Sequence, residues 1–214
     1  MRIVLLGPPA SGKGTLGRFL SAELRLGYLS TGALLRENIE QQTPLGLAAE
    51  PILARGAYLP DDLMCQILAD WLSKKDQAAG WVLDGFPRSL DQAKFLDHEL
   101  SSHNQALHCA VALEAPFEEL LKRIQNRVEC PSCRWSGQKS ELSASDRCPK
   151  CGDFASPRAD DDEQNFRNRH AEFLSITTPA IEYYRESGKL LSISAVGSKE
   201  ETSARILAHI TSFL

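Results

Sequence analysis

The chain has 214 residues, of which 43% are hydrophobic and 24% are charged, and its formal net charge is -4 at pH 7. This composition is ordinary for a globular protein with one substantial core. The negative net charge argues against the broad cationic surface that general nucleic-acid or membrane-surface binding needs, so we expect any phosphate binding to be local. No apolar run approaches the roughly 18 residues that cross a bilayer, and we expect a cytoplasmic protein.

The chain begins with a predicted strand, glycine-rich loop and helix. Arg2–Leu6 is a short apolar run, and Gly7–Thr15 reads Gly-Pro-Pro-Ala-Ser-Gly-Lys-Gly-Thr. Apolar residues at helical spacing follow over Leu16–Leu24. An unrelated glycine-rich turn would not need both flanking elements, so their presence favours a functional loop.

Phosphate binding is the chemistry that this loop predicts. Gly7 and Gly12 carry no Cβ, so several backbone N–H groups can face one anion, while Lys13 adds a positive charge and the helix N-terminus adds its dipole. The strict P-loop pattern is missed by one position, because Gly14 separates the lysine from Thr15.

Strands and helices alternate along the rest of the chain. Thr31 is predicted to cap the helix after the second strand, and Asp84 ends a buried strand, at the sheet edge where α/β proteins bind ligands. Alternation predicts an α/β fold with a parallel sheet and right-handed crossovers. The remaining predicted elements are strands at 27–30, 80–84, 108–113 and 190–193, a helical insertion at 31–59 broken at 43–44 and 55–56, and helices from 60, over 116–128 and over 198–213.

Four cysteines interrupt this alternation. Cys130 and Cys133 form one C-x-x-C pair, and Cys148 and Cys151 form a second pair after a spacer of 14 residues. This spacing is typical of a tetrahedral zinc site, and four thiolates leave no open position for substrate, so the predicted role of the zinc is structural. Two disulfides or free thiols are the alternative in an intracellular chain.

Several motifs together resemble the adenylate kinase family, in its bacterial type with a zinc-bearing lid, over nearly the whole chain. They are the opening loop, Ser30-Thr-Gly32 with Arg36, Asp84-Gly-Phe-Pro-Arg88 with Gln92, Arg158-Ala-Asp-Asp161 with Arg169, and the four cysteines. The resemblance implies a three-layer P-loop sandwich around a five-stranded parallel sheet. Its expected divisions are a core at 1–29, 60–125 and 161–214, a nucleoside monophosphate (NMP)-binding insertion at 30–59 and a zinc-binding lid at 126–160.

The resemblance also implies an activity, namely reversible Mg²⁺-dependent transfer of a phosphoryl group from ATP to AMP by a monomer, giving two ADP. Such transfer needs positioning and charge neutralisation more than covalent help. The implied catalytic cations are Lys13, Arg88, Arg127, Arg158 and Arg169. The implied ATP contacts are Ala10, Ser11, Gly12, Lys13, Gly14, Thr15, Arg123, Arg127, Ser136, Gly137 and Gly197. The implied AMP contacts are Thr31, Arg36, Ala57, Tyr58, Leu59, Gly85, Phe86, Pro87, Arg88, Gln92, Arg158 and Arg169. Asp84 would orient water on Mg²⁺.

Spacing adds some detail to the arginines. Arg123 and Arg127 are four apart on the predicted helix 116–128, so both should project from one face. Arg167 and Arg169 differ by about 200° on a helix, so they cannot serve one site, and the family motif favours Arg169. The amide of Gln92 can donate and accept together, which suits the Watson–Crick edge of adenine but could serve another base.

The chain departs from the family pattern in two places. Ala33 stands where relatives often have Asp, which removes one carboxylate from the expected magnesium shell. Arg134-Trp-Ser-Gly137 replaces a more familiar turn, and the spacer between the cysteine pairs is short. A cis Phe86–Pro87 peptide is expected, as in relatives.

Other functions remain open at this point. The acceptor could be UMP or CMP, or the donor GTP. A zinc-ribbon module that contacts RNA or protein is weakened because Glu141, Asp146 and Asp153 offset the positive charge of the cysteine segment. A catalytically silent nucleotide sensor rests on Ala33 alone.

Overall fold

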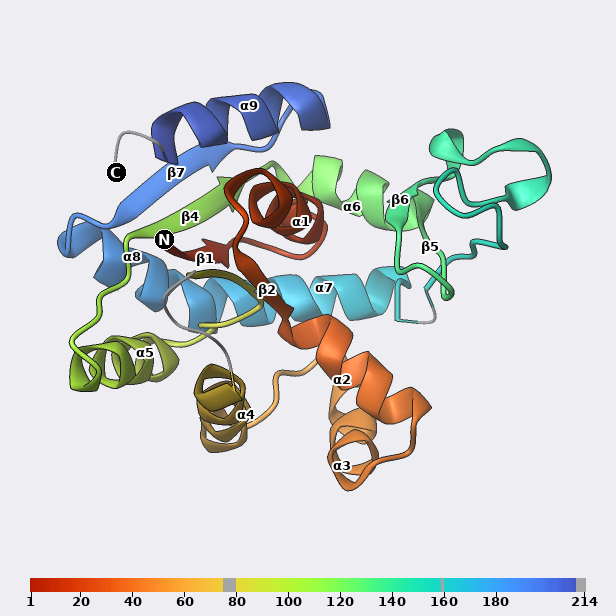
Figure 1. Ribbon diagram of the computed structural model, residues 1–214. Coiled ribbons are helices and arrows are strands. Elements are labelled where there is room, and N and C mark those ends of the chain that lie inside the picture. The colour runs from red at the N-terminus through yellow and green to blue at the C-terminus, as the bar shows by residue number, and fades with distance from the viewer. Residues whose placement is uncertain (75–79, 159, 211–214) are drawn as a thin grey trace.

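A central parallel sheet organises the protein (Figure 1). The computed structural model describes residues 1–74, 80–158 and 160–210. The sheet has the order β2-β3-β1-β4-β7, so β1 lies in its middle and hydrogen-bonds to β3 and β4. Its strands are β1 (Arg2–Leu6), β2 (Gly27–Ser30), β3 (Trp81–Asp84), β4 (Cys109–Glu114) and β7 (Leu190–Ser194).

Helices connect the strands and cover both faces of the sheet. In Figure 1, α1 and α9 lie above the sheet, and α4, α5 and α8 lie below it. Burial on two faces explains why the strands read as continuous apolar runs instead of alternating with polar residues. The helices are α1 (Lys13–Leu24), α2 (Thr31–Glu40), α3 (Pro44–Leu53), α4 (Asp61–Lys74), α5 (Leu90–Ser102), α6 (Phe117–Asn126), α7 (Glu163–Glu172), α8 (Thr178–Glu186) and α9 (Lys199–Ile210), with a π-helical turn at Phe173–Thr177 between α7 and α8.

Two separate cores result from the alternating side chains of the strands. Ile3 and Leu5 of β1 pack with Leu20 of α1 and Ile206 of α9 on one face. The neighbouring β1 residues pack on the other face with α4, α5 and α8, where the fully buried Tyr184 lies. The structure is therefore the expected three-layer α/β sandwich with five parallel strands.

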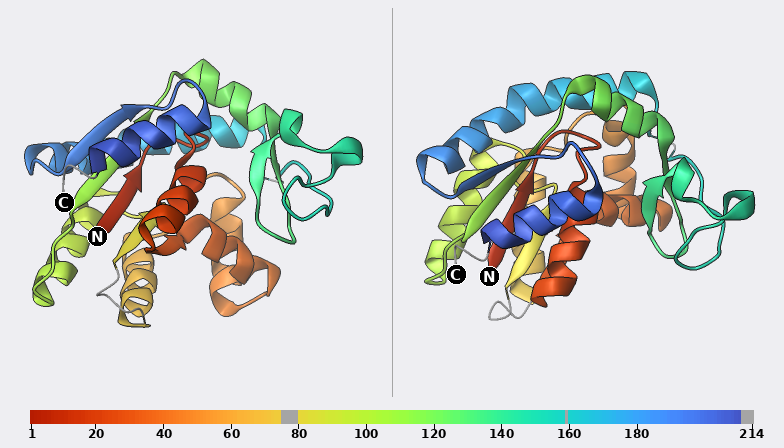
Figure 2. Two further views of the ribbon diagram at one scale, coloured as in Figure 1. Left: turned by 45° about the horizontal axis from the view of Figure 1, so that its top comes forward. Right: turned by 90° about the horizontal axis from the view of Figure 1, so that it is seen from above.

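Two excursions leave the sandwich beyond the carboxyl ends of the strands. One is the α2–α3 hairpin. The other is a lobe that contains the two-stranded antiparallel sheet of β5 (Arg127–Glu129) and β6 (Ser136–Gln138), with 3₁₀ turns at Lys139–Glu141 and Ala144–Asp146. Figure 2 shows both excursions standing away from the sheet, with the lobe beyond the end of α6.

The structure corrects several local predictions. Ser30, not Thr31, caps α2, because its Oγ accepts the N–H of Ala33 at 3.4 Å. The helix predicted over 116–128 ends at Asn126, since Arg127 is extended and begins β5. The first helix begins at Lys13, before the predicted start at Leu16, and the structure adds the helices α5 and α8, which the sequence patterns do not predict. Residues 211–213 of the predicted last helix lie outside the described residues.

Other expectations are confirmed. The insertion breaks at 43–44 and 55–56, between α2 and α3 and before α4, and the Phe86–Pro87 peptide is cis. Among helices in the described ranges, none combines the length and apolar character that crossing a membrane requires.

Candidate active site

The loop between β1 and α1 wraps around the side chain of Lys13. The Lys13 ammonium donates to the carbonyl oxygens of Gly7 and Pro8, both at 2.8 Å. A glycine is needed at position 7, because φ is 138° and a Cβ there would lie 2.7 Å from the Leu113 carbonyl oxygen. Burial lowers the pKa of Lys13 to about 8, with Asp84 opposing the shift and nearby arginines adding to it. The loop thus holds the Lys13 ammonium group at the carboxyl end of β1.

A cleft of about 950 Å³ opens from this loop and reaches both α2 and the β5–β6 lobe. Most of the predicted site residues line it. They are Ala10, Ser11, Gly12, Lys13, Gly14, Thr15, Arg36, Tyr58, Asp84, Gly85, Pro87, Arg88, Arg123, Arg127, Ser136, Gly137, Arg158, Arg169 and Gly197. Thr31, Ala57, Leu59, Phe86 and Gln92 are not among the described residues that line it.

Three arginines on the lobe side of the cleft share two aspartates. The Arg127 guanidinium makes a bidentate pair with Asp161, whose side chain is only 2% exposed. Arg158 donates to both oxygens of Asp160, at 3.1 and 2.9 Å. Arg169 donates to Asp160 Oδ2 at 3.1 Å and lies 3.9 Å from Asp161 Oδ1. The aspartates therefore hold three guanidinium groups together that would otherwise repel one another.

Burial and neighbouring charges shift the pKa values of Asp160 and Arg169 in this cluster. Burial opposes the charged form of Asp160, but Arg158 and Arg169 outweigh it and lower the pKa of Asp160 to about 2. Burial lowers the pKa of Arg169 to about 10, with Arg127 and Arg158 adding to the shift. Asp160 and Arg169 therefore both remain charged near neutral pH.

Arg127 reaches the cleft by a different route from the one predicted. It lies in β5 and not on the helix that carries Arg123. Both arginines nevertheless line the cleft. The prediction of one shared helical face is wrong, and a strand that pairs with β6 supplies Arg127 instead.

Arg88 belongs to the α2 side of the cleft. Its Nε donates to the Gly85 carbonyl oxygen at 2.9 Å, and its guanidinium lies 4.5 Å from the centroid of the Tyr58 ring. The Arg88 backbone N–H donates to Gln92 Oε1 at 2.7 Å, while Gln92 Nε2 donates to Asp61 Oδ1 at 2.7 Å. Gln92 is thus buried beside the cleft with its amide orientation fixed by two partners.

The far end of the cleft is built by α6 and the turn before α9. Arg123 Nε donates to Glu119 at 3.0 Å, and its Nη2 donates to the Ala195 carbonyl oxygen at 2.8 Å. Gly197, with φ of 110°, follows in the same turn. Arg123 and Gly197 therefore both line this end of the cleft.

Two more side chains predicted from sequence lie between these regions. Arg36 on α2 has its Nη2 3.9 Å from Glu129 Oε1 of β5. Asp84, 8% exposed, accepts from the Tyr28 hydroxyl at 3.1 Å, while its backbone carbonyl accepts from Thr31 Oγ1 at 3.3 Å. Arg167, in contrast, pairs with Glu163 on the exposed face of α7, which agrees with the choice of Arg169.

The four cysteines of the lobe form one cluster. Their Sγ atoms all lie within 4.8 Å of one another. Cys130 and Cys151 are separated by 3.5 Å and Cys133 and Cys148 by 3.6 Å, far beyond a disulfide bond and near the roughly 3.8 Å between ligands of a tetrahedral zinc thiolate. The donor set fits a structural Zn²⁺ ion.

Sequence analysis gave no role to Tyr28, Asp160 or Asp161. The two aspartates follow Arg158 by two and three positions, inside a motif of the family resemblance, which is an available signal for paired charges. Tyr28 carried no such signal, because its partner Asp84 is 56 residues away in the chain and meets it only through strand pairing.

Comparison with known proteins gives one consistent family. A family model described as adenylate kinase matches residues 5–189. The chain is 37% identical over 212 residues to the adenylate kinase of Methanocella arvoryzae, covering 98% of each chain. It is 38% identical over 210 residues to the adenylate kinase of Thermodesulfovibrio yellowstonii, covering 97% of this chain and 98% of that one. Similarity thus extends from the phosphate loop through the lobe to the last helix.

Proposed function

The chain belongs to the adenylate kinase family and is a nucleoside monophosphate kinase that transfers a phosphoryl group between ATP and AMP, and we propose how its residues divide this work. The observation that carries the proposal is the convergence of five predicted cations, Lys13, Arg88, Arg127, Arg158 and Arg169, on one cleft. Other acceptors or donors are not favoured, because the relatives named above are adenylate kinases.

Phosphoryl transfer places negative charge on the oxygens of the moving group, and fixed cations around that position lower the barrier. Lys13 and the N–H groups of Gly12 and Gly14 hold the donor phosphates at the start of α1. Arg127, Arg158 and Arg169 surround the transferred group from the lobe side. The acceptor phosphate is already an anion near neutral pH, so the reaction needs no general base.

The donor base would lie at the far end of the cleft. Arg123 stacks on adenine there, supported by its hydrogen bond to Ala195. The backbone at Ser136, Gly137 and Gly197, together with Ala10, Ser11 and Thr15 of the loop, completes the ATP site. Each of these residues lines the cleft.

The acceptor site would lie on the α2 side. Arg36 and Arg88 hold the AMP phosphate, and the Tyr58 ring keeps Arg88 in place through its cation–π contact. Gln92 would select adenine. Its Oε1 accepts one hydrogen bond from Arg88 and its Nε2 donates one to Asp61, so a second oxygen lone pair and a second N–H stay available for the edge of a base. Gly85 and Pro87 line the cleft on this side and would contact AMP, together with the described residues Thr31, Ala57, Leu59 and Phe86, which lie outside that lining.

Two metals complete the proposal. Mg²⁺ bound with ATP neutralises phosphate charge, and the buried carboxylate of Asp84 at the cleft wall would orient its water ligands. Zn²⁺ bound by Cys130, Cys133, Cys148 and Cys151 stabilises the lobe, whose own core is small. Free thiolates persist in a reducing compartment, which supports a cytoplasmic location.

We further propose that the excursions move. Residues 30–59 and 126–160 would act as NMP-binding and lid domains of a monomer that close on the core and exclude water from the reaction. Contacts that span the two excursions, such as the bidentate Arg134–Glu40 pair, support a closed arrangement.

The direct test is a coupled assay with ATP, Mg²⁺ and AMP, UMP, CMP or GMP in turn, with GTP as a second donor. Metal content is measured on the same sample. We expect ADP formation with AMP and about one zinc per chain. Turnover of AMP no faster than of UMP or CMP would contradict AMP selection. In Gln92→Ala, KM for AMP should rise while KM for ATP stays constant.

A further inference from the structure

Tyr28 forms a hydrogen bond that the known reaction does not assign. It is partly buried on the edge strand β2, and its hydroxyl donates to Asp84 Oδ2 at 3.1 Å. In the parallel register, Tyr28 lies beside Val82 and Ser30 lies beside Asp84. The phenol therefore reaches two residues along β3, to the carboxylate at the carboxyl end of the sheet.

Two glycines of α1 make room for this tyrosine. A Cβ at Gly17 would lie 2.5 Å from Cε2 of Tyr28, and a Cβ at Gly14 would lie 3.4 Å from Asp84 Oδ2 and 3.9 Å from the Tyr28 hydroxyl oxygen. Gly17 is in the helix interior, where glycine is disfavoured relative to alanine. The first turns of α1 thus leave a slot that the Tyr28 ring fills.

The hydrogen bond fixes an otherwise adjustable carboxylate. The terminal torsion of an aspartate is broad, so its two oxygens can face a range of directions. Holding Oδ2 determines where the other oxygen of Asp84 points. Burial, followed by the adjacent Asp84 charge, raises the pKa of Tyr28 well above its ordinary value, so its hydroxyl stays a donor. Tyr28 is not among the described residues that line the cleft, whereas Asp84 is.

We propose that Tyr28 is a positioning residue, which orients the Asp84 carboxylate toward the water shell of the magnesium that enters with ATP. The inference rests on the proposed role of Asp84. Tyr28 never touches nucleotide in this scheme and acts only through the carboxylate.

Tyr28→Phe tests this directly, since it keeps the ring against Gly17 and removes only the hydroxyl. Isothermal titration measures ATP affinity once with Mg²⁺ and once with EDTA. We expect the ratio of the two affinities to fall about tenfold, the effect of losing one hydrogen bond to a charged group. AMP affinity, which needs no metal, should stay constant, and kcat should fall with KM for AMP unchanged.

Tyr183→Phe is the matched control. Tyr183 donates to Asp97 Oδ2 at 3.0 Å, an equivalent tyrosine–aspartate bond on α8 that lies outside the cleft lining. The Tyr183→Phe variant should lose about as much free energy of unfolding as Tyr28→Phe. Its ratio of ATP affinity with Mg²⁺ to ATP affinity with EDTA should equal that of the wild type. An unchanged ratio in Tyr28→Phe would overturn the inference.

Asp84→Asn distinguishes a failure of the role proposed for Tyr28 from a failure of the role proposed for Asp84. If Asp84→Asn lowers the Mg²⁺ ratio and Tyr28→Phe does not, only the role of Tyr28 fails. If neither variant changes the ratio, the role proposed for Asp84 fails as well. When both proposals hold, the double variant is no worse than Asp84→Asn alone, because both changes affect the same carboxylate.

Discussion

The two walls of the cleft hold their cations by different means. On the core side, Lys13 and Arg88 are held by backbone carbonyl oxygens, those of Gly7 and Pro8 for Lys13 and that of Gly85 for Arg88. On the side that faces the lobe, Arg127 and Arg158, with Arg169 of the neighbouring helix α7, are held by the carboxylates of Asp160 and Asp161.

This difference follows from what each wall is built on. The core loops are fixed by the sheet, so their carbonyl dipoles can aim a cation without carrying charge. The lobe-side arginines lie close together: burial lowers the pKa of Arg169, and Arg127 and Arg158 add to the shift. Acidic partners must balance their charges. Carbonyl groups do not titrate and carboxylates do, so the two walls should respond differently to mutation and to pH.

The largest effect should come from the core wall. Lys13→Met removes the cation from the phosphate loop, and we expect kcat/KM for ATP to fall by about 10³ or more, as for other groups that stabilise transition-state charge. Lys94→Met, at an exposed position on α5, is the control and should match wild type in steady-state kinetics. If kcat/KM for ATP falls less than tenfold in Lys13→Met, the arginines on the lobe side are sufficient for phosphoryl transfer without Lys13.

The next effect concerns the stability of the lobe wall. Asp161→Asn leaves Arg127 without its buried partner and should lower the free energy of unfolding by about 3 kcal/mol. Glu163→Gln breaks the exposed Arg167 pair on α7 and should cost less than about 1 kcal/mol. Urea denaturation of both variants measures the difference, and equal losses would refute the distinction between buried and exposed pairs.

An alkaline limit should mark the core wall. Since burial lowers the pKa of Lys13 to about 8, the charged fraction falls above that pH, and kcat/KM for ATP should drop about tenfold per pH unit. Steady-state kinetics between pH 7 and about 9.5 measure this limb. A flat profile would mean that the ammonium is not required in the free enzyme.

An acid limit should mark the lobe wall. The pKa of Asp160 is about 2 in the folded protein, below its unfolded value near 3.9. Its stabilising contribution is therefore complete above about pH 4 and is lost as pH falls through about 2. Asp160→Asn should be less stable at neutral pH and show a shallower loss of stability over that interval in thermal denaturation. A slope identical to wild type would argue against the pairing.

We expect the smallest effect from breaking the ion pair between the two excursions, which tests whether that pair contributes to their closure. Arg134 adopts φ of 57° in the turn after Cys133 and pairs with Glu40 at the end of α2. Both side chains are exposed, so the pair should be worth less than about 1 kcal/mol. We expect Glu40→Gln to change kcat by less than about fivefold and to remove part of its dependence on NaCl. A salt dependence equal to wild type would exclude a role for this pair in closure.

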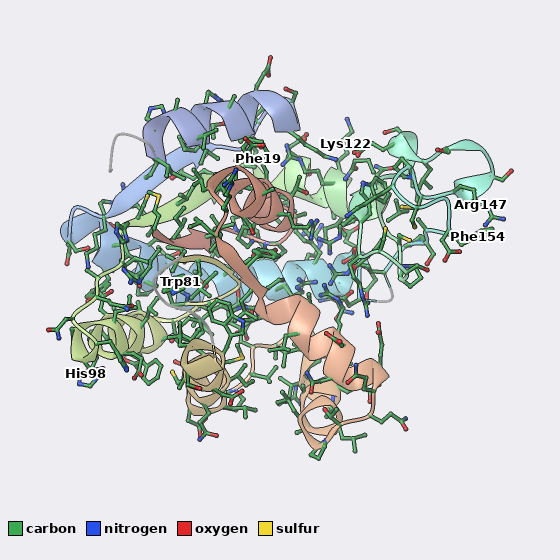
Figure 3. The ribbon with its side chains drawn as sticks, in the orientation of Figure 1. Phe19, Trp81, His98, Lys122, Arg147 and Phe154 are labelled. Carbon is green, nitrogen blue, oxygen red and sulfur yellow. The ribbon has the colours of Figure 1, made fainter. Side chains whose placement is uncertain are left out.

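At the outer end of the lobe, Arg147 and Phe154 contact each other, and neither is among the described residues that line the cleft. Arg147 lies over the ring of Phe154 at 4.7 Å, and both project from the tip in Figure 3. These residues should therefore tolerate substitution better than the cysteines behind them. Glu141, Asp146 and Asp153 offset the positive charge of the lobe, which weakens the idea of an RNA-binding module.

Local chemistry along the chain was enough to predict the phosphate loop, the parallel sheet and the cysteine cluster. Each leaves a signal in residues close in sequence: Gly7, Gly12 and Lys13 lie in one loop, each cysteine pair spans one turn, and each strand is a single apolar run. The strands can be predicted from sequence because burial on both faces of a sheet requires unbroken apolar runs.

Tertiary structure alone decided how distant charges are paired. Strand pairing brings Tyr28 to Asp84 and the lobe brings Arg127 to Asp161, and no helical spacing predicts either contact. Arg127 shows why: α6 ends at Asn126, and Arg127 instead pairs with Gln138 of β6, which lies 11 residues further along the chain. Side-chain partners across the fold depend on where each element ends, which the packing of the whole molecule determines.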